Sequence, residues 1–138
     1  MTYVLDTNTV SYFLRGEGNV ESYFQKEVVS AGNPYAIPCI VAYEVWRWLH
    51  DKPTGQIKAF ARQFDILFTN VQDKAQMTVN IWMKAADVYI DLKQKGQLIG
   101  DADILIAAYC LANNYTLVTN NPSDFGRING LTHVNWYA

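Results

Sequence analysis

The residues whose types and spacing could carry chemistry are acids on four separate segments: Asp6, Glu44, Asp101, Asp103 and Asp124. Some have simple structural explanations when taken alone. An aspartate is favoured at the start of a helix, which would explain Asp6 and one of Asp101 and Asp103. Asp124 follows the turn at residues 120–123 and could be an exposed loop acid. A cap does not explain both aspartates of the 101 and 103 pair, because the second points elsewhere around the helix.

Glu44 is the acid that is hardest to explain as a surface residue. Ile40 and Trp48 stand four residues away on either side, so the carboxylate emerges from an apolar stretch of helix. Burying it without a partner would cost several kcal/mol. Arg47 lies within helical reach and is one candidate partner, and a metal ion shared with the other acids is the alternative.

Carboxylates that converge from separate segments repel one another, which raises their pKa values unless divalent cations neutralise them. Oxygen ligands without cysteine or paired histidine select Mg²⁺ or Mn²⁺ over zinc, and such cations suit phosphoryl chemistry. The chain has no phosphate-binding loop of the Gly-x-x-x-x-Gly-Lys type and no Gly-x-Ser-x-Gly motif. His50 and His133 are solitary and are expected to be structural. The acids therefore predict metal-dependent hydrolysis of a phosphodiester or phosphate.

Short apolar runs and helical periodicity predict the elements that must position these acids. Strands are expected at 2–5, 35–37, 116–118 and 132–136, and helices at 10–14, 19–31, 39–50, 53–68, 73–96 and 101–111. The side chains of Thr7, Asn8 and Thr9 are expected to cap the first helix, and Asp73 the fifth. The run at 66–68 could instead begin a further strand.

The alternation of short apolar strands with helices predicts an α/β fold, a three-layer α/β/α sandwich with a short, mostly parallel central sheet. Ligands of such sheets bind at the carboxyl ends of the strands, where Asp6 and Thr119 both fall.

The composition predicts one compact domain over residues 1–138, since half of the chain is hydrophobic and 17% is charged. The longest apolar stretch, 104–112, is too short to cross a bilayer, and the first residues lack the basic start of a signal peptide, so no membrane contact and a cytoplasmic location are expected. Cys39 and Cys110 are expected in the core. The net charge is −2, but outside the five acids the chain has eight acids against eleven Lys and Arg, which permits a polyanionic partner.

Four segments together resemble the PIN-domain family, and specifically the VapC-like toxin ribonucleases of type II toxin–antitoxin systems. They are residues 3–8 with the first acid, 40–45 with the glutamate, 99–108 with the third acid, and 117–125 with the last. Each motif is weak alone, but all four occur in order, and the resemblance covers nearly the whole chain.

The resemblance implies an endoribonuclease that hydrolyses RNA phosphodiester bonds with a water activated by Mg²⁺ or Mn²⁺. It places the metal ligands at Asp6, Glu44 and Asp103, with Asp101 as an accessory acid. For the fourth ligand it favours Asp124, while many relatives carry an acid where this chain has Asn121, which could order a water. Asn8 and Thr119 match positions that orient the first acid and line the site. A homodimer and a cognate antitoxin partner are implied as well.

Two alternatives remain open at the level of sequence. One is a haloacid-dehalogenase-like phosphatase, although the second aspartate that such enzymes need is absent at Asn8. The other is a non-catalytic module of the same fold that binds RNA or a protein partner. Metal titration would separate this module from an enzyme, because the module would lack a specific Mg²⁺ or Mn²⁺ site.

Overall fold

A four-stranded parallel sheet forms the centre of the molecule. The structure, a computed structural model, describes residues 1–71 and 76–138. The strands are β1 (Tyr3–Leu5), β2 (Tyr35–Ala36), β3 (Thr116–Val118) and β4 (His133–Val134), and they lie in the order β2-β1-β3-β4 with every neighbour parallel. Val4 pairs with Ala36 on one side and Leu117 on the other, and all three are fully buried. The sheet confirms the predicted α/β fold and parallel topology.

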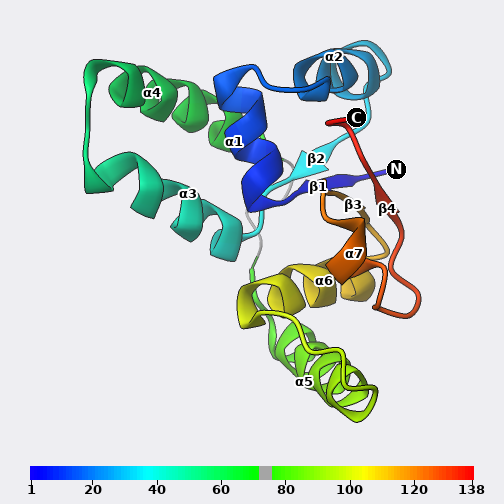
Figure 1. Ribbon diagram of the computed structural model, residues 1–138. Coiled ribbons are helices and arrows are strands. Elements are labelled where there is room, and N and C mark those ends of the chain that lie inside the picture. Colours follow the sequence, from blue (N-terminus) through cyan, green and yellow to red (C-terminus); the bar gives the residue numbers. More distant parts are fainter. Residues whose placement is uncertain (72–75) are drawn as a thin grey trace.

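Helices cover both faces of this sheet (Figure 1). They are α1 (Thr7–Arg15), α2 (Val20–Phe24), the π-helical turn η1 (Gln25–Ser30), α3 (Cys39–Asp51), α4 (Gly55–Thr69), α5 (Val79–Gln94), α6 (Asp101–Asn113) and α7 (Pro122–Phe125). The chain moves from β1 outward to β2 and then back across β1 to β3. Right-handed crossovers in these opposite directions place α1 and α2 on one face and α6 and α7 on the other. Helix α6 is apolar on nearly all sides because it lies between β3 and α5.

Several predicted boundaries were wrong, each for a local reason. The expected helix at 19–31 is divided into α2 and η1. The alternative strand at 66–68 is the last part of α4, whose buried residues Phe64 and Leu67 stand three positions apart, which is helical spacing. The expected cap Asp73 lies outside the described residues, and α5 begins at Val79.

Two expectations about small features also need correction. Cys110 is buried as predicted, but Cys39 is exposed at the first position of α3. Helix α7 was not predicted, and it begins where a turn was expected. Among the described residues, no helix is long and apolar enough to span a membrane.

The C-terminal segment packs closely over the turn between α1 and α2. Gly18 has a φ of +63°, and a Cβ there would lie 2.7 Å from both the ring and the carbonyl oxygen of Tyr137. The same carbonyl accepts a hydrogen bond from the amide of Asn19 at 3.1 Å. A side chain at residue 18 would therefore displace the end of the chain.

We expect Gly18→Ala to lower the free energy of unfolding by about 2 kcal/mol or more, through strain at positive φ and the clash with Tyr137. Gly16→Ala is the matched control, because Gly16 has a φ of +68° and open space around it. Gly16→Ala should lower the free energy of unfolding by about 1 kcal/mol, the cost of the positive φ alone. Urea unfolding measures both, and equal losses would show that the contact with Tyr137 adds nothing.

Candidate active site

Asp6 is the most buried acid of the site, with 6% of its surface exposed. It directly follows β1 and is the N-cap of α1, where its Oδ1 accepts a hydrogen bond from the amide of Thr9 at 2.8 Å. The hydroxyl of Thr119 donates a second hydrogen bond to it. Burial outweighs these bonds and raises the pKa of Asp6 above its ordinary value, with a smaller contribution from the charge of Glu44. Asp6 is therefore both a helix cap and a buried carboxylate.

Thr119 joins the ends of β1 and β3. It is fully buried directly after β3, and its hydroxyl oxygen accepts a hydrogen bond from the amide of Asn121 at 3.0 Å while it also bonds Asp6. Val118 adds to this junction, because its carbonyl accepts from the amide of Asp6 at 3.3 Å and from the hydroxyl of Thr9 at 2.9 Å. The predicted position of Thr119 beside the first acid is found in the structure.

Glu44 is half-buried on α3 and faces the start of α1. The hydroxyl of Thr7 donates to its Oε1 at 2.6 Å. Arg47, the partner that helical spacing offered, lies instead over the ring of Tyr43 at 5.2 Å and donates to its hydroxyl at 3.3 Å. The two side chains were within reach on the helix, but Arg47 turned toward the exposed aromatic ring.

Asp103 and Asp101 occupy the first turn of α6 but have different surroundings. Asp103 is half-buried, and burial followed by the charges of Asp6, Glu44 and Asp124 raises its pKa to about 6. Asp101 is exposed and lines an apolar groove between α5 and α6. The expectation that one of these two aspartates caps the helix is wrong, since the N-cap is Gly100 and no side chain caps the helix there.

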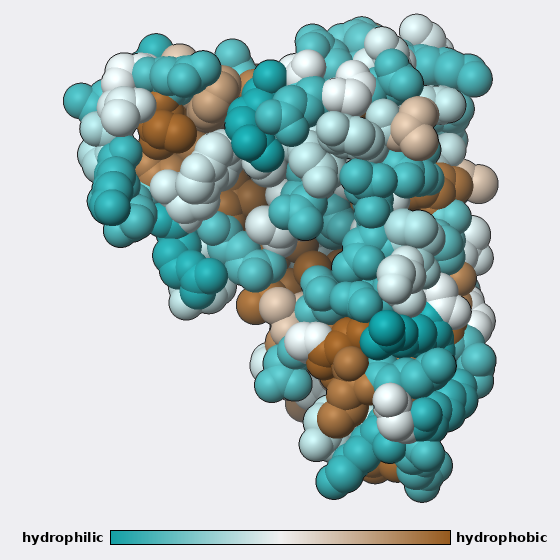
Figure 2. All heavy atoms as spheres, viewed as in Figure 1, coloured by the Kyte–Doolittle hydropathy of each residue, from teal (hydrophilic) through white to brown (hydrophobic). Residues whose placement is uncertain are grey.

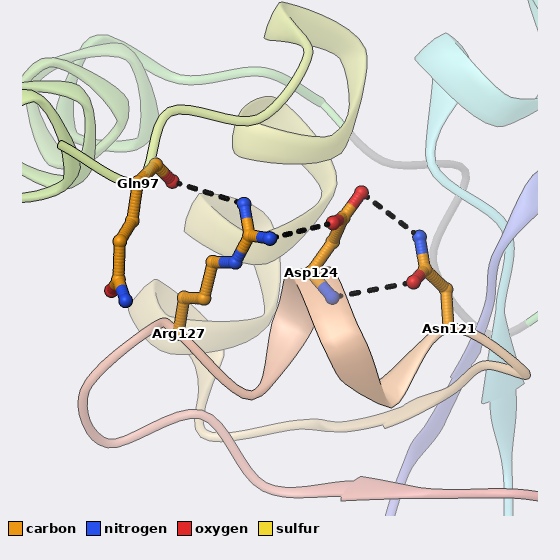
Figure 3. Close-up of polar contacts among 4 residues, drawn as sticks. All are labelled: Gln97, Asn121, Asp124 and Arg127. Carbon is orange, nitrogen blue, oxygen red and sulfur yellow. Dashed lines mark hydrogen bonds and ion pairs between the residues drawn. The ribbon is translucent and has the colours of Figure 1, made fainter.

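Asp124 lies on α7 and is held by a residue before the helix and one after it (Figure 3). Its Oδ2 accepts from the side-chain amide of Asn121 at 3.1 Å, and its backbone amide donates back to Oδ1 of Asn121 at 3.2 Å. Its Oδ1 lies 3.7 Å from a guanidinium nitrogen of Arg127, which also donates to the carbonyl of Gln97 at 3.4 Å. Asn121 and Asp124 are therefore one hydrogen-bonded unit, and Arg127 partly offsets its charge.

The site contains residues that the sequence reasoning assigned differently. Thr7, Asn8 and Thr9 were expected to cap the first helix from outside, but they lie within α1 because Asp6 is the cap. Asn8 is exposed, and the hydrogen bonds to Asp6 come from Thr9 and Thr119. The sequence signal that could have predicted Asp6 as the cap is Thr9, three residues later, whose amide is in position to donate to a capping aspartate. Arg127 was not expected as a partner of Asp124.

The four acids are coupled by charge but are not drawn into a ligand cage. Within residues 1–71 and 76–138, no three His, Cys, Asp or Glu side chains stand close enough together to hold a metal ion as they are. Mutual repulsion of carboxylates favours this separation. The donor set itself consists of oxygen atoms only, and it fits a hard divalent cation that would draw the acids together.

The raised pKa of Asp103 predicts a pH-dependent effect on the stability of the metal-free protein. With a folded pKa of about 6 against an ordinary 3.8, the folded state binds the proton more tightly, so stability falls as pH rises between these values. Asp103→Asn should therefore raise the free energy of unfolding at pH 7 by about 1 kcal/mol, since exposure screens part of the repulsion.

This gain should be largely lost by pH 4, where the carboxyl is protonated in the folded state and about half protonated in the unfolded state. Urea unfolding in a chelator at pH 7 and pH 4 measures the difference. An Asp101→Asn variant, altered at the exposed neighbour, serves as the control. A gain for Asp103→Asn that is the same at both pH values would contradict repulsion as its cause.

Comparison with known proteins identifies the family. The model of the PIN domain matches residues 3–131. Ribonuclease VapC2 of Rickettsia felis is 30% identical over 142 residues, covering 99% of this chain and 98% of that protein. Ribonuclease VapC2 of Haemophilus influenzae is 38% identical over 145 residues, with the same coverage. The crystal structure of VapBC2 from Rickettsia felis, bound to a DNA fragment from their promoter, matches with a TM-score of 0.84 at 29% identity over 99% of both chains. The chain therefore belongs to the PIN domain family and is related within it to the VapC ribonucleases.

Proposed function

We propose that this protein is a metal-dependent endoribonuclease and the toxin of a VapBC-type toxin–antitoxin pair. The observation that carries the proposal is the position of Asp103 at the carboxyl edge of the sheet. The charges of acids from three other segments act on its carboxylate there and raise its pKa. The names of the relatives support RNA as the substrate. The family match leaves no place for the phosphatase alternative.

In this proposal Asp6, Glu44 and Asp103 hold the divalent cation, Mg²⁺ or Mn²⁺, and Asp124 completes the set. The cation, when bound, neutralises phosphate oxygens and activates the attacking water. Thr119 and the Thr9 amide fix the Asp6 carboxylate, and Thr7 fixes that of Glu44, so these two acids are oriented before the cation arrives. Such fixed orientation lowers the reorganisation that hydrolysis requires.

A protein partner and a second copy of the chain are part of the proposal. The similar Rickettsia felis structure is an assembly of VapBC2, which supports an antitoxin partner. The proposed homodimer is supported by apolar surface on α5, where Val79, Trp82 and Met83 are all more than half exposed. Hydrophobic surface gathers over the part of the molecule formed by α5 and α6 in Figure 2. Patches of this kind mark protein interfaces.

The non-catalytic module is the second candidate, favoured by the absence of a ready-made cluster of three ligands in the described residues. Calorimetric titration with Mn²⁺ separates the two. An enzyme should bind Mn²⁺ at a defined stoichiometry that Asp6→Asn reduces, whereas the module should bind weakly with or without this substitution.

Asp6→Asn and Asp103→Asn should each lower the rate of RNA cleavage by at least about a hundredfold, because each removes a charged ligand while keeping the side-chain shape. Asp101→Asn should leave the rate within about threefold, since Asp101 is exposed and faces the groove beside α5. The three rates are compared on one RNA in Mg²⁺. Wild-type cleavage by Asp6→Asn would refute the proposed function, and an inactive Asp101→Asn would place the third acid two residues earlier.

The unit of Asn121 and Asp124 makes a further prediction. Asp124→Ala should raise the Mn²⁺ concentration for half-maximal cleavage by about tenfold or more, through loss of a full negative charge. Asn121→Ala should raise it by a smaller factor, because it frees the carboxylate that Asn121 now holds at 3.1 Å. Ser123→Ala, an exposed change on the same helix, is the control. A larger effect for Asn121→Ala would move the fourth ligand to that residue.

A further inference from the structure

A cavity of about 240 Å³ lies between α1 and α3, directly beside the acids. Helix α1 contributes Thr7, Asn8, Ser11 and Arg15 to its wall, and α3 contributes Glu44, Val45 and Trp48. Glu44 also belongs to the acid cluster, and the hydroxyl of Thr7 bonds it at 2.6 Å. The cavity therefore shares Glu44 with the proposed reaction centre.

We propose that this cavity is a subsite for one nucleotide of single-stranded RNA, next to the nucleotide whose phosphate is cleaved. The inference rests on the proposed function and specifies where its substrate is held. The wall offers three kinds of contact that a nucleotide needs: a cation for phosphate, an aromatic face for the base, and small polar side chains for the ribose and base edges.

Arg15 supplies the cation, at the end of the cavity away from the acids. It follows Thr7 by eight positions along α1, a rise of about 12 Å. Its guanidinium therefore meets a neighbouring phosphate and not the scissile one. Arg15 now lies 3.3 Å from Glu17, and both side chains are about two-fifths exposed. An exposed pair of this kind contributes little stability, so the guanidinium is free to exchange this carboxylate for phosphate.

Trp48 supplies the aromatic face. It is half-buried, lines the cavity and has its ring centroid 6.1 Å from that of Phe60, which packs against it. Stacking on such a ring accepts any base. Asn8 and Ser11 lie on the same wall as Arg15 and present an amide and a hydroxyl, the groups that read a base edge or a 2′-hydroxyl. This gives the exposed Asn8 a role toward substrate instead of toward Asp6.

The test is the affinity of the full-length protein for a short fluorescein-labelled oligouridylate, measured by fluorescence anisotropy in EDTA so that no cleavage occurs. Arg15→Ala should weaken binding about tenfold and reduce the dependence of log K on log salt by about 0.7, the value for one phosphate of a single strand. Glu17→Gln should tighten binding by about twofold, because it releases Arg15 from its present partner.

Trp48 is tested with substitutions that preserve its packing on Phe60. Trp48→Leu keeps an apolar side chain but removes the ring face, and should weaken binding about tenfold. Trp48→Phe restores a ring and should bind within about threefold of the wild type. Arg62→Ala, which removes an exposed cation from α4 outside this cavity, is the control for general charge and should leave the salt dependence closer to that of the wild type than Arg15→Ala does.

The outcomes separate this inference from the proposed function. If Arg15→Ala and Trp48→Leu bind the RNA as well as the wild type does, the proposed subsite is wrong. The proposed function is then still tested separately by the cleavage assay. Equal weakening by Arg62→Ala and Arg15→Ala would also overturn the subsite, since it would show diffuse charge attraction. If the wild type neither binds nor cleaves RNA, both proposals fail.

Discussion

Asp6 carries a carboxylate into the protein interior at the end of β1, and the arrangement of neighbouring elements is set by the need to compensate it. A buried carboxylate without hydrogen bonds is costly. The amide of Thr9 is available only because α1 begins directly after β1, and the hydroxyl of Thr119 only because β3 lies beside β1. The strand order and the start of the first helix thus both supply hydrogen bonds to the Asp6 carboxylate.

This compensation is incomplete, and the remainder explains the electrostatics of the site. The pKa of Asp6 is raised despite its hydrogen bonds. Asp103 is less buried, and its pKa is raised as well, by its partial burial and by repulsion from Asp6, Glu44 and Asp124. A protein selected for stability alone would replace such a group by a neutral residue. Strain of this kind is retained at functional sites, where a bound cation turns repulsion into affinity.

The sequence was sufficient for what local patterns determine and insufficient for what tertiary contacts determine. Apolar runs located β1 and β3, and the four motifs contain the acids whose charges act on Asp103 in the structure. Side-chain choices could not be predicted in this way. Helical spacing allowed Arg47 to reach Glu44, but the exposed ring of Tyr43 competed for it, and the partner of Glu44 came from Thr7 on another helix. Spacing states which contacts are possible, and packing selects among them.

Asp124 differs from the other acids in a way that bears on its role. It has a guanidinium within 3.7 Å, while the pKa of Asp103 responds to three carboxylates and to no cation. It also lies on a four-residue helix that depends on the Asn121 cap, whereas Asp6, Glu44 and Asp103 lie on or against helices of nine to thirteen residues. A short capped turn can shift at low cost, because few backbone hydrogen bonds hold it. Under the proposed function, the three acids on or against the longer helices would therefore define where a cation sits. Asp124 would be the member that moves toward it by exchanging Arg127 for the metal.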